Sequence, residues 1–359
     1  MALQSIDIVF FDAGGGHRAA ATALKLVCEQ QQRPWRIRLV HLKDILDSID
    51  VFRKVTRIDL QEIYNLMLRK GWTLGSPQGL RFMQGVIALM RKPAVRLLTD
   101  CWRRDPPDMV VSVVPNFNRA LFEAWQTAAP GRRFVTILTD LADYPPHFWI
   151  ERQPQDFICG APKAVEQALQ LGHPRERIFQ TSGMILHPRF YEPLEIDRTA
   201  ELSRLGLDPS RRTGLVLFGG YGSEVMRSIQ KQLAGEQLIL IAGKNDKLRA
   251  ALAGEPRHHV EGFTTKVPYF MKLADYFIGK PGPGSLSEAL HFGLPVVTAS
   301  NAWTLPQERY NAEWLVENQY GVALTSFRDV ASAIERLPAS ITPPPNRALF
   351  EIPDHWASA

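Results

Sequence analysis

The sequence predicts an α/β protein of two doubly wound domains, each with a parallel sheet flanked by helices. Short apolar runs alternate with helix-like segments along most of the chain, which is typical of strands buried on both faces. This pattern breaks near 187–212, a polar stretch with prolines, and then restarts with a new strand and glycine turn. We therefore expect one domain over 1–190 and a second over 195–340. An irregular tail over 341–359 is expected to cross back to the first domain.

In the first half, each expected strand is a short apolar run, and the runs are separated by turns or amphipathic segments. The strands are expected at 6–11, 36–42, 109–114, 134–139, 157–161 and 178–182. Helices are expected at about 18–30, 118–128 and 163–171.

The second half repeats this order. Strands are expected at the start of 215–223, at 237–243, at 258–264, at the start of 276–285 and at 294–300. Helices are expected at about 285–292 and 307–318. Each half thus has a glycine turn directly after its first strand, where a ligand can approach the main chain.

The composition is that of an ordinary globular protein. The chain has 359 residues, of which 45% are hydrophobic and 22% charged, and this excludes a disordered chain. Cys28, Cys101 and Cys159 are far apart and form no CxxC pair, which excludes the common zinc sites and favours a reducing compartment. No apolar run approaches the roughly 20 residues that a membrane span needs, and the first basic residue is Arg18, so neither a membrane span nor a signal peptide is expected.

Positive charge is concentrated in 53–104, where eleven basic and three acidic residues give a local net charge of +8. Apolar residues recur there at helical spacing, as in the series Met83, Val86, Ile87 and Met90 and the series from Leu60 to Leu68. Such a segment suits an anionic membrane surface. The residues expected to contact it are Trp72, Met83, Ile87, Arg91, Lys92 and Arg96.

Two other interpretations of this basic segment remain open. It could form two core helices with solvated basic faces. Nucleic-acid binding is less favoured and is not expected, because no zinc-finger or RNP-type motif accompanies the charge.

The first glycine turn leads to His17. The helix that follows places its N-terminus beside this residue, and the helix dipole disfavours an imidazolium there. A neutral histidine at a ligand site is a candidate general base. The alternatives are a capping histidine or a dinucleotide site, although the spacing is not GxGxxG.

Three further motifs provide groups for an anion and a sugar. The glycines of 219–223 and 279–285 offer main-chain N–H groups, the second set at a helix start. Glu288 follows one turn later and could accept hydrogen bonds from the vicinal hydroxyls of a ribose; a capping-box role is the alternative. Gln307, Glu308 and Asn311 open another helix, as sugar-binding groups or as ordinary surface residues.

Taken in order, the motifs GGGHR, FGGYGS, GFTTKVPYFMKLADYFIGKPGPGSLSEAL and PQERYNA resemble the GT-B glycosyltransferases of family 28. The nearest members are the monogalactosyldiacylglycerol synthases and the bacterial diacylglycerol glucosyltransferases. The peptidoglycan-lipid N-acetylglucosaminyltransferase is a more distant relative. The resemblance spans roughly 8–325 and includes the segment from Thr139 to Trp149. It implies two Rossmann-like domains facing a cleft.

The resemblance also implies roles for individual residues. The catalytic base would be His17, with Asp140 in reserve, and the acceptor would lie near Gly15, Gly16 and Trp149. The donor UDP-sugar would bind the second domain: its diphosphate at the glycine turns, its ribose at Glu288 and its hexose at Gln307 and Glu308. The donor set is Gly220, Tyr221, Gly222, Gly284, Ser285, Glu288, Gln307 and Glu308.

The expected enzyme is an inverting hexosyltransferase that moves a hexose from UDP-glucose or UDP-galactose to diacylglycerol or a similar lipid, giving a β-glycolipid. No DxD triplet occurs in the chain, so neither a metal nor another cofactor is expected. The expected location is cytoplasmic, at the inner face of the membrane and peripherally bound. Alternatives are a UDP-sugar epimerase of the same fold, a MurG-like transferase to another lipid-linked acceptor, and a non-catalytic nucleotide-sugar-binding subunit.

Overall fold

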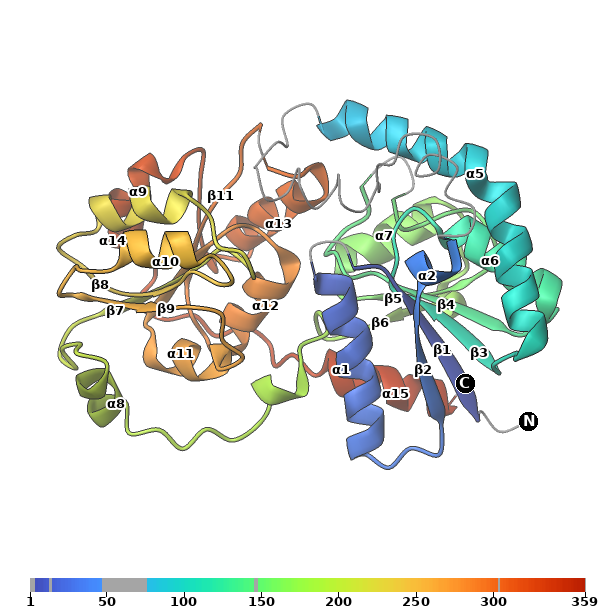
Figure 1. The fold of residues 1–359 in the computed structure, drawn as a ribbon, viewed down its shortest axis with the longest axis horizontal. Helices are drawn as coiled ribbons and strands as arrows, with labels where there is room; N and C mark the ends of the chain where they lie inside the picture. Colours follow the sequence, from blue (N-terminus) through green and yellow to red (C-terminus); the bar gives the residue numbers. More distant parts are fainter. Residues whose placement is uncertain (1–3, 13–14, 47–75, 145–147, 303, 359) are drawn as a thin grey trace. The chain divides into compact units, whose positions relative to one another are not determined.

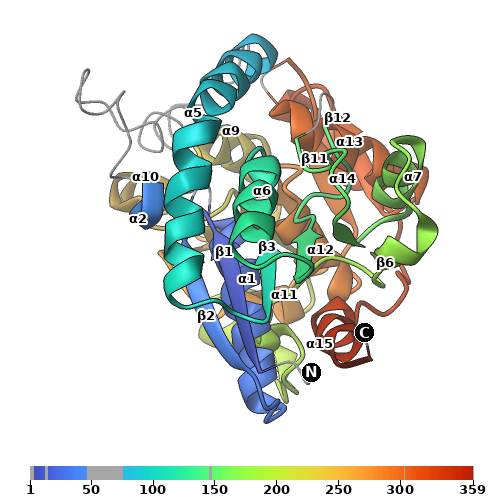
Figure 2. The ribbon, with the colours of Figure 1, turned by 90° about the vertical axis from the view of Figure 1, so that its right-hand side faces the viewer.

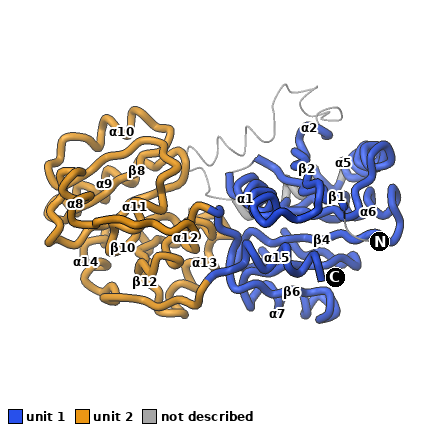
Figure 3. Tube along the Cα trace, turned by 90° about the horizontal axis from the view of Figure 1, so that it is seen from below, with its two compact units in different colours: residues 1–188, 346–359 blue, residues 189–345 orange. Residues whose placement is uncertain are grey.

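The computed structural model describes residues 4–12, 15–46, 76–144, 148–302 and 304–358 (Figure 1). The chain forms two compact units, which Figure 3 shows in different colours. Unit 1 comprises 1–188 together with 346–359, and unit 2 comprises 189–345. Each unit has its own parallel sheet, as the restart of the strand pattern in the sequence predicts.

The sheet of unit 1 has the strand order β2-β1-β3-β4-β5-β6, and every pair is parallel. Its strands coincide with the predicted runs: β1 Ser5–Phe10, β2 Arg36–His41, β3 Met109–Ser112, β4 Arg133–Ile137, β5 Asp156–Cys159 and β6 Ile178–Gln180. Val9 on β1 lies between Val40 on β2 and Ser112 on β3. The strand order therefore reverses between β1 and β3, and ligands of doubly wound sheets bind at the carboxyl ends beside such a reversal.

Among the described residues of unit 1 that precede its last segment, the helices are α1 Gly16–Gln30, α2 Leu42–Leu46, α5 Ser76–Arg104, α6 Asn118–Ala128 and α7 Pro162–Gln170, with a 3-10 turn at Arg175–Arg177. The predicted helix around Leu60 lies outside the described residues. The one around Met83 falls within α5, which lies beside α6 (Figure 2).

The second half of α5 packs on the sheet through residues four apart: Ala94, Leu98 and Trp102 are buried. The Trp102 ring meets that of Trp125 on α6 edge to face, with centroids 5.5 Å apart. This part of the basic segment is therefore a core helix with one solvated face.

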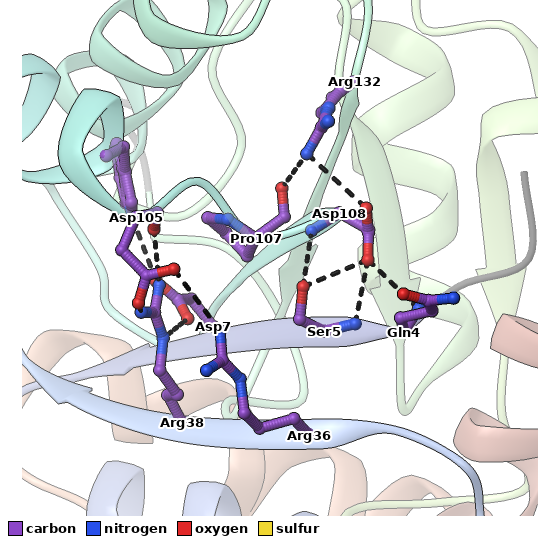
Figure 4. Close-up of polar contacts among 10 residues, drawn as sticks. Gln4, Ser5, Asp7, Arg36, Arg38, Asp105, Pro107, Asp108 and Arg132 are labelled. Carbon is purple, nitrogen blue, oxygen red and sulfur yellow. Dashed lines mark hydrogen bonds and ion pairs between the residues drawn. The ribbon is translucent and has the colours of Figure 1, made fainter.

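A polar network fixes the amino ends of the first strands (Figure 4). Asp7 on β1 is 1% exposed, and its carboxylate accepts hydrogen bonds from Arg38 Nε at 2.6 Å and Trp102 Nε1 at 3.1 Å. Arg38 also pairs with Asp105, at the end of α5. A buried charge is tolerated when it is paired and hydrogen-bonded, so this network stabilises the edge opposite to the candidate site.

The predicted irregular tail is wrong from Ala348 onward, because Ala348–Ser358 forms helix α15. Its buried residues fall on one face at helical spacing, and this apolar stripe prevails over Pro353 inside the helix. The helix belongs to unit 1, where it packs beside α1. The Asn346 amide donates to the Met184 carbonyl at 2.9 Å, and the Ser182 N–H donates to Glu351 at 2.7 Å.

The sheet of unit 2 has the order β12-β11-β10-β7-β8-β9, again parallel throughout. Its strands are β7 Thr213–Leu217, β8 Gln237–Ile241, β9 His258–Glu261, β10 Tyr276–Gly279, β11 Val296–Ala299 and β12 Gly321–Leu324. The strand order reverses between β7 and β10. The short strand β12 was not predicted.

The helices of unit 2 are α8 Arg198–Arg204, α9 Val225–Gln232, α10 Asp246–Leu252, α11 Val267–Leu273, α12 Pro283–His291, α13 Pro306–Glu317 and α14 Val330–Glu335, with 3-10 turns at Pro188–Phe190, which spans the boundary with unit 1, and at Phe327–Asp329. The helices α12 and α13 match the predicted ones. Within the described ranges, no helix combines the length and apolar content that crossing a membrane requires.

Candidate functional site

The two glycine turns of unit 2 leave the neighbouring strands β7 and β10 at their carboxyl ends. They therefore meet at the reversal of strand order, the usual ligand site of such a sheet. The predicted donor residues of both turns lie at this edge.

The turn after β7 needs its glycines. Gly219 and Gly222 have positive φ angles of 75° and 61°, a region that favours glycine. A Cβ on Gly222 would also come within 2.6 Å of the Ala242 carbonyl oxygen. The Lys244 N–H donates to the Gly220 carbonyl at 2.8 Å, so the turns after β7 and β8 lie against each other. Tyr221 projects from this turn and is 55% exposed.

The turn after β10 leads into α12, whose N-cap is Gly282. No side chain caps this helix end. Gly284 and Ser285 are the second and third helical residues, and N–H groups at these positions have no partner within a helix. A Cβ on Gly284 would meet no atom within 4 Å. The arrangement is suited to bind an anion such as a diphosphate.

The carboxyl group of Glu288 is partly buried on α12, and no described residue donates a hydrogen bond to it. Burial raises the pKa of Glu288 to about 8, although the nearby Arg189 guanidinium acts in the opposite direction. A capping box would require the acid at the third helical position, which is Ser285. The structure thus rules out the capping-box alternative and leaves a carboxylate in need of a donor.

The start of α13 is fastened to the turn before α12. The Lys280 Nζ lies 2.8 Å from the Glu308 Oε1, and the Asn311 amide donates to the Pro281 carbonyl at 2.8 Å. Glu308 is only 8% exposed, whereas Gln307 is partly buried. The pairing of Lys280 with Glu308 was not predicted, since the two residues are far apart in the sequence.

Phe263, after β9, is a second residue that the sequence interpretation missed. Its ring is 55% exposed, and the Lys244 ammonium lies 4.9 Å from the ring centroid. Because Lys244 also contacts the Gly220 carbonyl, this aromatic surface lies close to the first glycine turn. The signal in the sequence was only a lone Phe after a short strand.

In unit 1, His17 lies at the start of α1, beside the reversal between β1 and β3. Gly15, the N-cap, has a φ of 82°, and Gly15 and Gly16 are exposed. The His17 Nδ1 lies 2.9 Å from the Thr139 Oγ1. Burial lowers the pKa of His17 to about 4, while a hydrogen bond with the main chain of Val113 opposes this shift. The ring is neutral at pH 7, as expected, but burial rather than the helix dipole is the leading cause.

The structure brings Asp140 and Trp149 together close to His17. The Trp149 Nε1 donates to the Asp140 Oδ2 at 2.8 Å, and the Trp149 ring centroid lies 5.7 Å from that of His17. Trp149 is 0% exposed, and its main-chain N–H donates to Asp143 at 2.6 Å. Burial raises the pKa of Asp143 to about 6. The Trp149 indole therefore orients Asp140 from within the core.

The predicted membrane-contacting residues lie on α5 where they are described. Lys92 and Arg96 are exposed, and Ile87 is partly buried. Arg91 lies 3.0 Å from the Glu123 carboxylate of α6. Trp72 and the side chain of Met83 lie outside the described residues.

No protein-family model matches the chain. Among individual proteins, it is 26% identical to monogalactosyldiacylglycerol synthases 1 and 3 of Arabidopsis thaliana and 25% identical to that of Spinacia oleracea, all chloroplastic. These matches cover 92%, 92% and 93% of this chain and 64%, 74% and 66% of those proteins. The chain thus spans about two thirds of the length of two of these relatives.

Solved structures with the same fold include the calicheamicin glycosyltransferase CalG4, with a TM-score of 0.59 and 17% identity over 100% of this chain and 94% of that one. Anabaena HepE in complex with UDP has a TM-score of 0.55 and 15% identity, and the match covers 99% of this chain and 100% of HepE. A UDP-N-acetylglucosamine 2-epimerase has a TM-score of 0.50 and 13% identity, covering 99% and 98%.

The comparisons agree with the predicted enzyme class, because the relatives in sequence are named as synthases of a glycolipid and one of these three structures, CalG4, is named as a glycosyltransferase. The structural neighbours support the fold alone, since all are below 20% identical. The chain is therefore similar over most of its length to monogalactosyldiacylglycerol synthases and has the GT-B fold of two doubly wound domains.

Proposed function

We propose that this chain is an inverting glycosyltransferase that moves a hexose from UDP-glucose or UDP-galactose to diacylglycerol or a similar lipid. The observation that carries the proposal is the match of 92–93% of the chain to proteins named for this kind of product. The geometry of unit 2 supports a nucleotide-sugar donor, and that of unit 1 supports a hydroxyl acceptor.

The donor site would use backbone groups and two acidic side chains, Glu288 toward the ribose and Glu308 toward the hexose. The diphosphate would lie at the uncapped start of α12 and the turn of Gly220 to Gly222, where N–H groups and the helix dipole favour an anion. The unpartnered Glu288 would accept hydrogen bonds from the ribose hydroxyls. An exposed ring such as Phe263 offers a stacking surface for a base. No step of this proposal needs a metal, and activity in excess EDTA tests that point.

The reaction would be a direct displacement. The acceptor oxygen forms a bond to the anomeric carbon while the bond from that carbon to the UDP oxygen breaks, and UDP leaves with the electron pair. The acceptor proton passes to His17, or to Asp140 in its place. A positioned base contributes about 10²–10⁴ in rate. One displacement inverts the anomeric centre, so an α-linked UDP-sugar gives a β-glycolipid.

The acceptor is apolar, so the enzyme would work at a bilayer. The exposed Lys92 and Arg96 on α5 would hold the protein peripherally on an anionic surface, such as the inner face of the cytoplasmic membrane. The proposal thus assigns the solvated face of the basic helix to lipid and its buried face to the core.

The test uses the purified chain, vesicles that contain diacylglycerol and an anionic lipid, and radiolabelled UDP-glucose or UDP-galactose in separate reactions. The expected result is a labelled hexosyl-diacylglycerol from one or both donors, with release of UDP. A glycosylated product that depends on diacylglycerol supports the acceptor, and vesicles without diacylglycerol are the control. No labelled lipid from either sugar would refute the proposal.

The second candidate function is epimerisation of a UDP-sugar, which the fold shared with a UDP-N-acetylglucosamine 2-epimerase favours. It would require no lipid. The same assay separates the two, because an epimerase converts UDP-N-acetylglucosamine to an epimer in solution and leaves diacylglycerol unlabelled.

A further inference from the structure

The hydroxyl of Thr139 is the described side-chain partner of His17, and no role was assigned to it from the sequence. Its Oγ1 lies 2.9 Å from the His17 Nδ1. Thr139 follows the carboxyl end of β4, and His17 opens α1 after β1. The two residues are 122 positions apart, and only the parallel order of β1, β3 and β4 brings them together.

Asp140, the next residue, faces another group. Its Oδ2 accepts a hydrogen bond from the Trp149 indole, so adjacent side chains hold the two rings of this site: Thr139 holds His17, and Asp140 holds Trp149. A histidine that acts as a base commonly has its second nitrogen oriented by a neighbouring group, which also sets the tautomer. Here the group at Nδ1 is a neutral hydroxyl.

We propose that Thr139 is a positioning residue that binds Nδ1 of His17 and leaves Nε2 to take the proton of the acceptor hydroxyl. The inference depends on the proposed function, in which His17 is the base. For Nε2 to accept a proton, the neutral ring must carry its proton on Nδ1. Thr139 Oγ1 then accepts the Nδ1–H hydrogen bond. When the acceptor oxygen attacks the anomeric carbon, its proton moves to Nε2, and UDP leaves with the electron pair of the broken bond.

The variants Thr139→Val and Thr139→Ser separate the hydroxyl from the shape of the side chain. Valine keeps the volume without the hydroxyl, and serine keeps the hydroxyl. Thr136→Val is the matched control, because Thr136 is a buried threonine of β4, three residues before Thr139, whose hydroxyl accepts a hydrogen bond from Gln155 at 3.0 Å. The assay is hexose transfer to diacylglycerol vesicles, with kcat and the KM for the donor measured for each variant.

We expect Thr139→Val to lower kcat about 10- to 100-fold, part of the 10²–10⁴ of a well-placed base, with an unchanged KM for the UDP-sugar. Thr139→Ser should restore kcat to within about threefold of the wild type. Thr136→Val should lower the melting temperature without this loss of kcat per folded protein. A Thr139→Val variant with wild-type kcat, or equal losses in all three variants, would overturn the inference.

A second measurement does not use activity. ¹⁵N NMR of histidine-labelled protein at pH 7 distinguishes a protonated from an unprotonated ring nitrogen, and the signals lost in His17→Gln assign His17. We expect protonated Nδ1 and unprotonated Nε2 in the wild type, and a mixture of tautomers in Thr139→Val. A wild-type ring protonated on Nε2, with that proton donated to the Val113 carbonyl, would overturn the inference.

The two failures are distinguishable. If His17→Ala keeps full transferase activity, the role of His17 as base in the proposed function is wrong. If His17→Ala is inactive while Thr139→Val has wild-type kcat and one tautomer, only the positioning role of Thr139 is wrong.

Discussion

The Lys280 ammonium and the Glu308 carboxylate form an ion pair, with 2.8 Å between Nζ and Oε1, that joins the turn before α12 to the first turn of α13. Gly282 borders the pair, because a Cβ there would lie 3.3 Å from the Lys280 Cε and 3.5 Å from the Glu308 Oε1. Both helix starts belong to the proposed donor site. Glu308 is thus a charged group that is already paired before a ligand arrives.

We expect the ion pair to contribute modestly to stability, because the Lys280 side chain is 42% exposed. A double-mutant cycle with Lys280→Met, Glu308→Gln and both together should give a coupling energy of about 0.5–1 kcal/mol. The free energies of unfolding come from urea titrations. If the two single substitutions change the free energy of unfolding additively, the coupling energy is zero and the ion pair does not stabilise the contact between the two helix starts.

For Glu288, we expect replacement by alanine to weaken UDP binding by about 1–3 kcal/mol, the cost of losing the hydrogen bonds that its carboxyl group accepts. Calorimetry with UDP measures this. Glu313→Ala, which removes an exposed carboxylate from α13, is the control and should bind UDP like the wild type. Equal affinities for all three proteins would leave Glu288 without a role in binding.

The raised pKa of Glu288 gives a stability test with a definite sign. Burial raises its pKa from 4.5 to about 8 in the folded chain, so folding disfavours the ionised form. The penalty is absent below about pH 4.5, grows as pH rises toward 8 and then levels off. Glu288→Gln should therefore raise the melting temperature at pH 8 relative to the wild type and change it little at pH 5. The opposite order would contradict the burial of this carboxyl.

His17→Ala should lower kcat by about 10²–10⁴ and leave UDP affinity nearly unchanged, since the donor groups belong to unit 2. With a pKa of about 4, His17 becomes protonated only near pH 4. Its protonation should therefore lower kcat only in that acidic range and leave kcat unchanged between pH 6 and 8. His41→Gln, at the end of β2, is the control histidine. If Asp140→Asn loses activity while His17→Ala retains most of it, the base is Asp140.

Of the basic residues predicted to contact the membrane, Lys92 and Arg96 on α5 are exposed, so the membrane prediction is tested on these two. Lys92→Gln with Arg96→Gln should weaken binding to anionic vesicles by about 2 kcal/mol, at about 1 kcal/mol per charge near the surface, and should spare UDP binding. The control pair Arg227→Gln with Lys231→Gln removes two exposed charges at the same spacing from α9. Co-sedimentation measures both. Arg91 is left intact because it pairs with Glu123. If both double variants lose the same amount of vesicle binding, the binding depends only on the net charge of the protein and not on the exposed face of α5.

The strands could be predicted from sequence because a strand buried on both faces is a continuous apolar run, as in Met109–Ser112. The tail was predicted to be irregular because its prolines outweighed the apolar stripe of Leu349, Ile352 and Trp356. This stripe is buried in the fold, where α15 packs beside α1, and the sequence does not show that contact. Strand β12 has only four residues, and three of them are partly exposed. Its sequence therefore has no apolar run or alternation long enough to predict a strand.

The site was predictable only as far as its local motifs. The glycine turns and Glu288 follow their strands directly, so their place at the sheet edge follows from the sequence. The contacts of Lys280 with Glu308 and of His17 with Thr139 join separate strand ends. They depend on strand order, which a single sequence does not contain.

The central claim is tested most directly by the anomeric configuration of the product. The wild-type chain is incubated with diacylglycerol vesicles and UDP-glucose or UDP-galactose labelled with ¹³C at C1, and the anomeric signal is followed by NMR. The account predicts that the α-linked donor signal is replaced by that of a β-linked hexosyl lipid, with one UDP released for each hexose transferred. An α-linked lipid would contradict the single displacement, and an epimerised UDP-sugar with no labelled lipid would contradict the transferase itself.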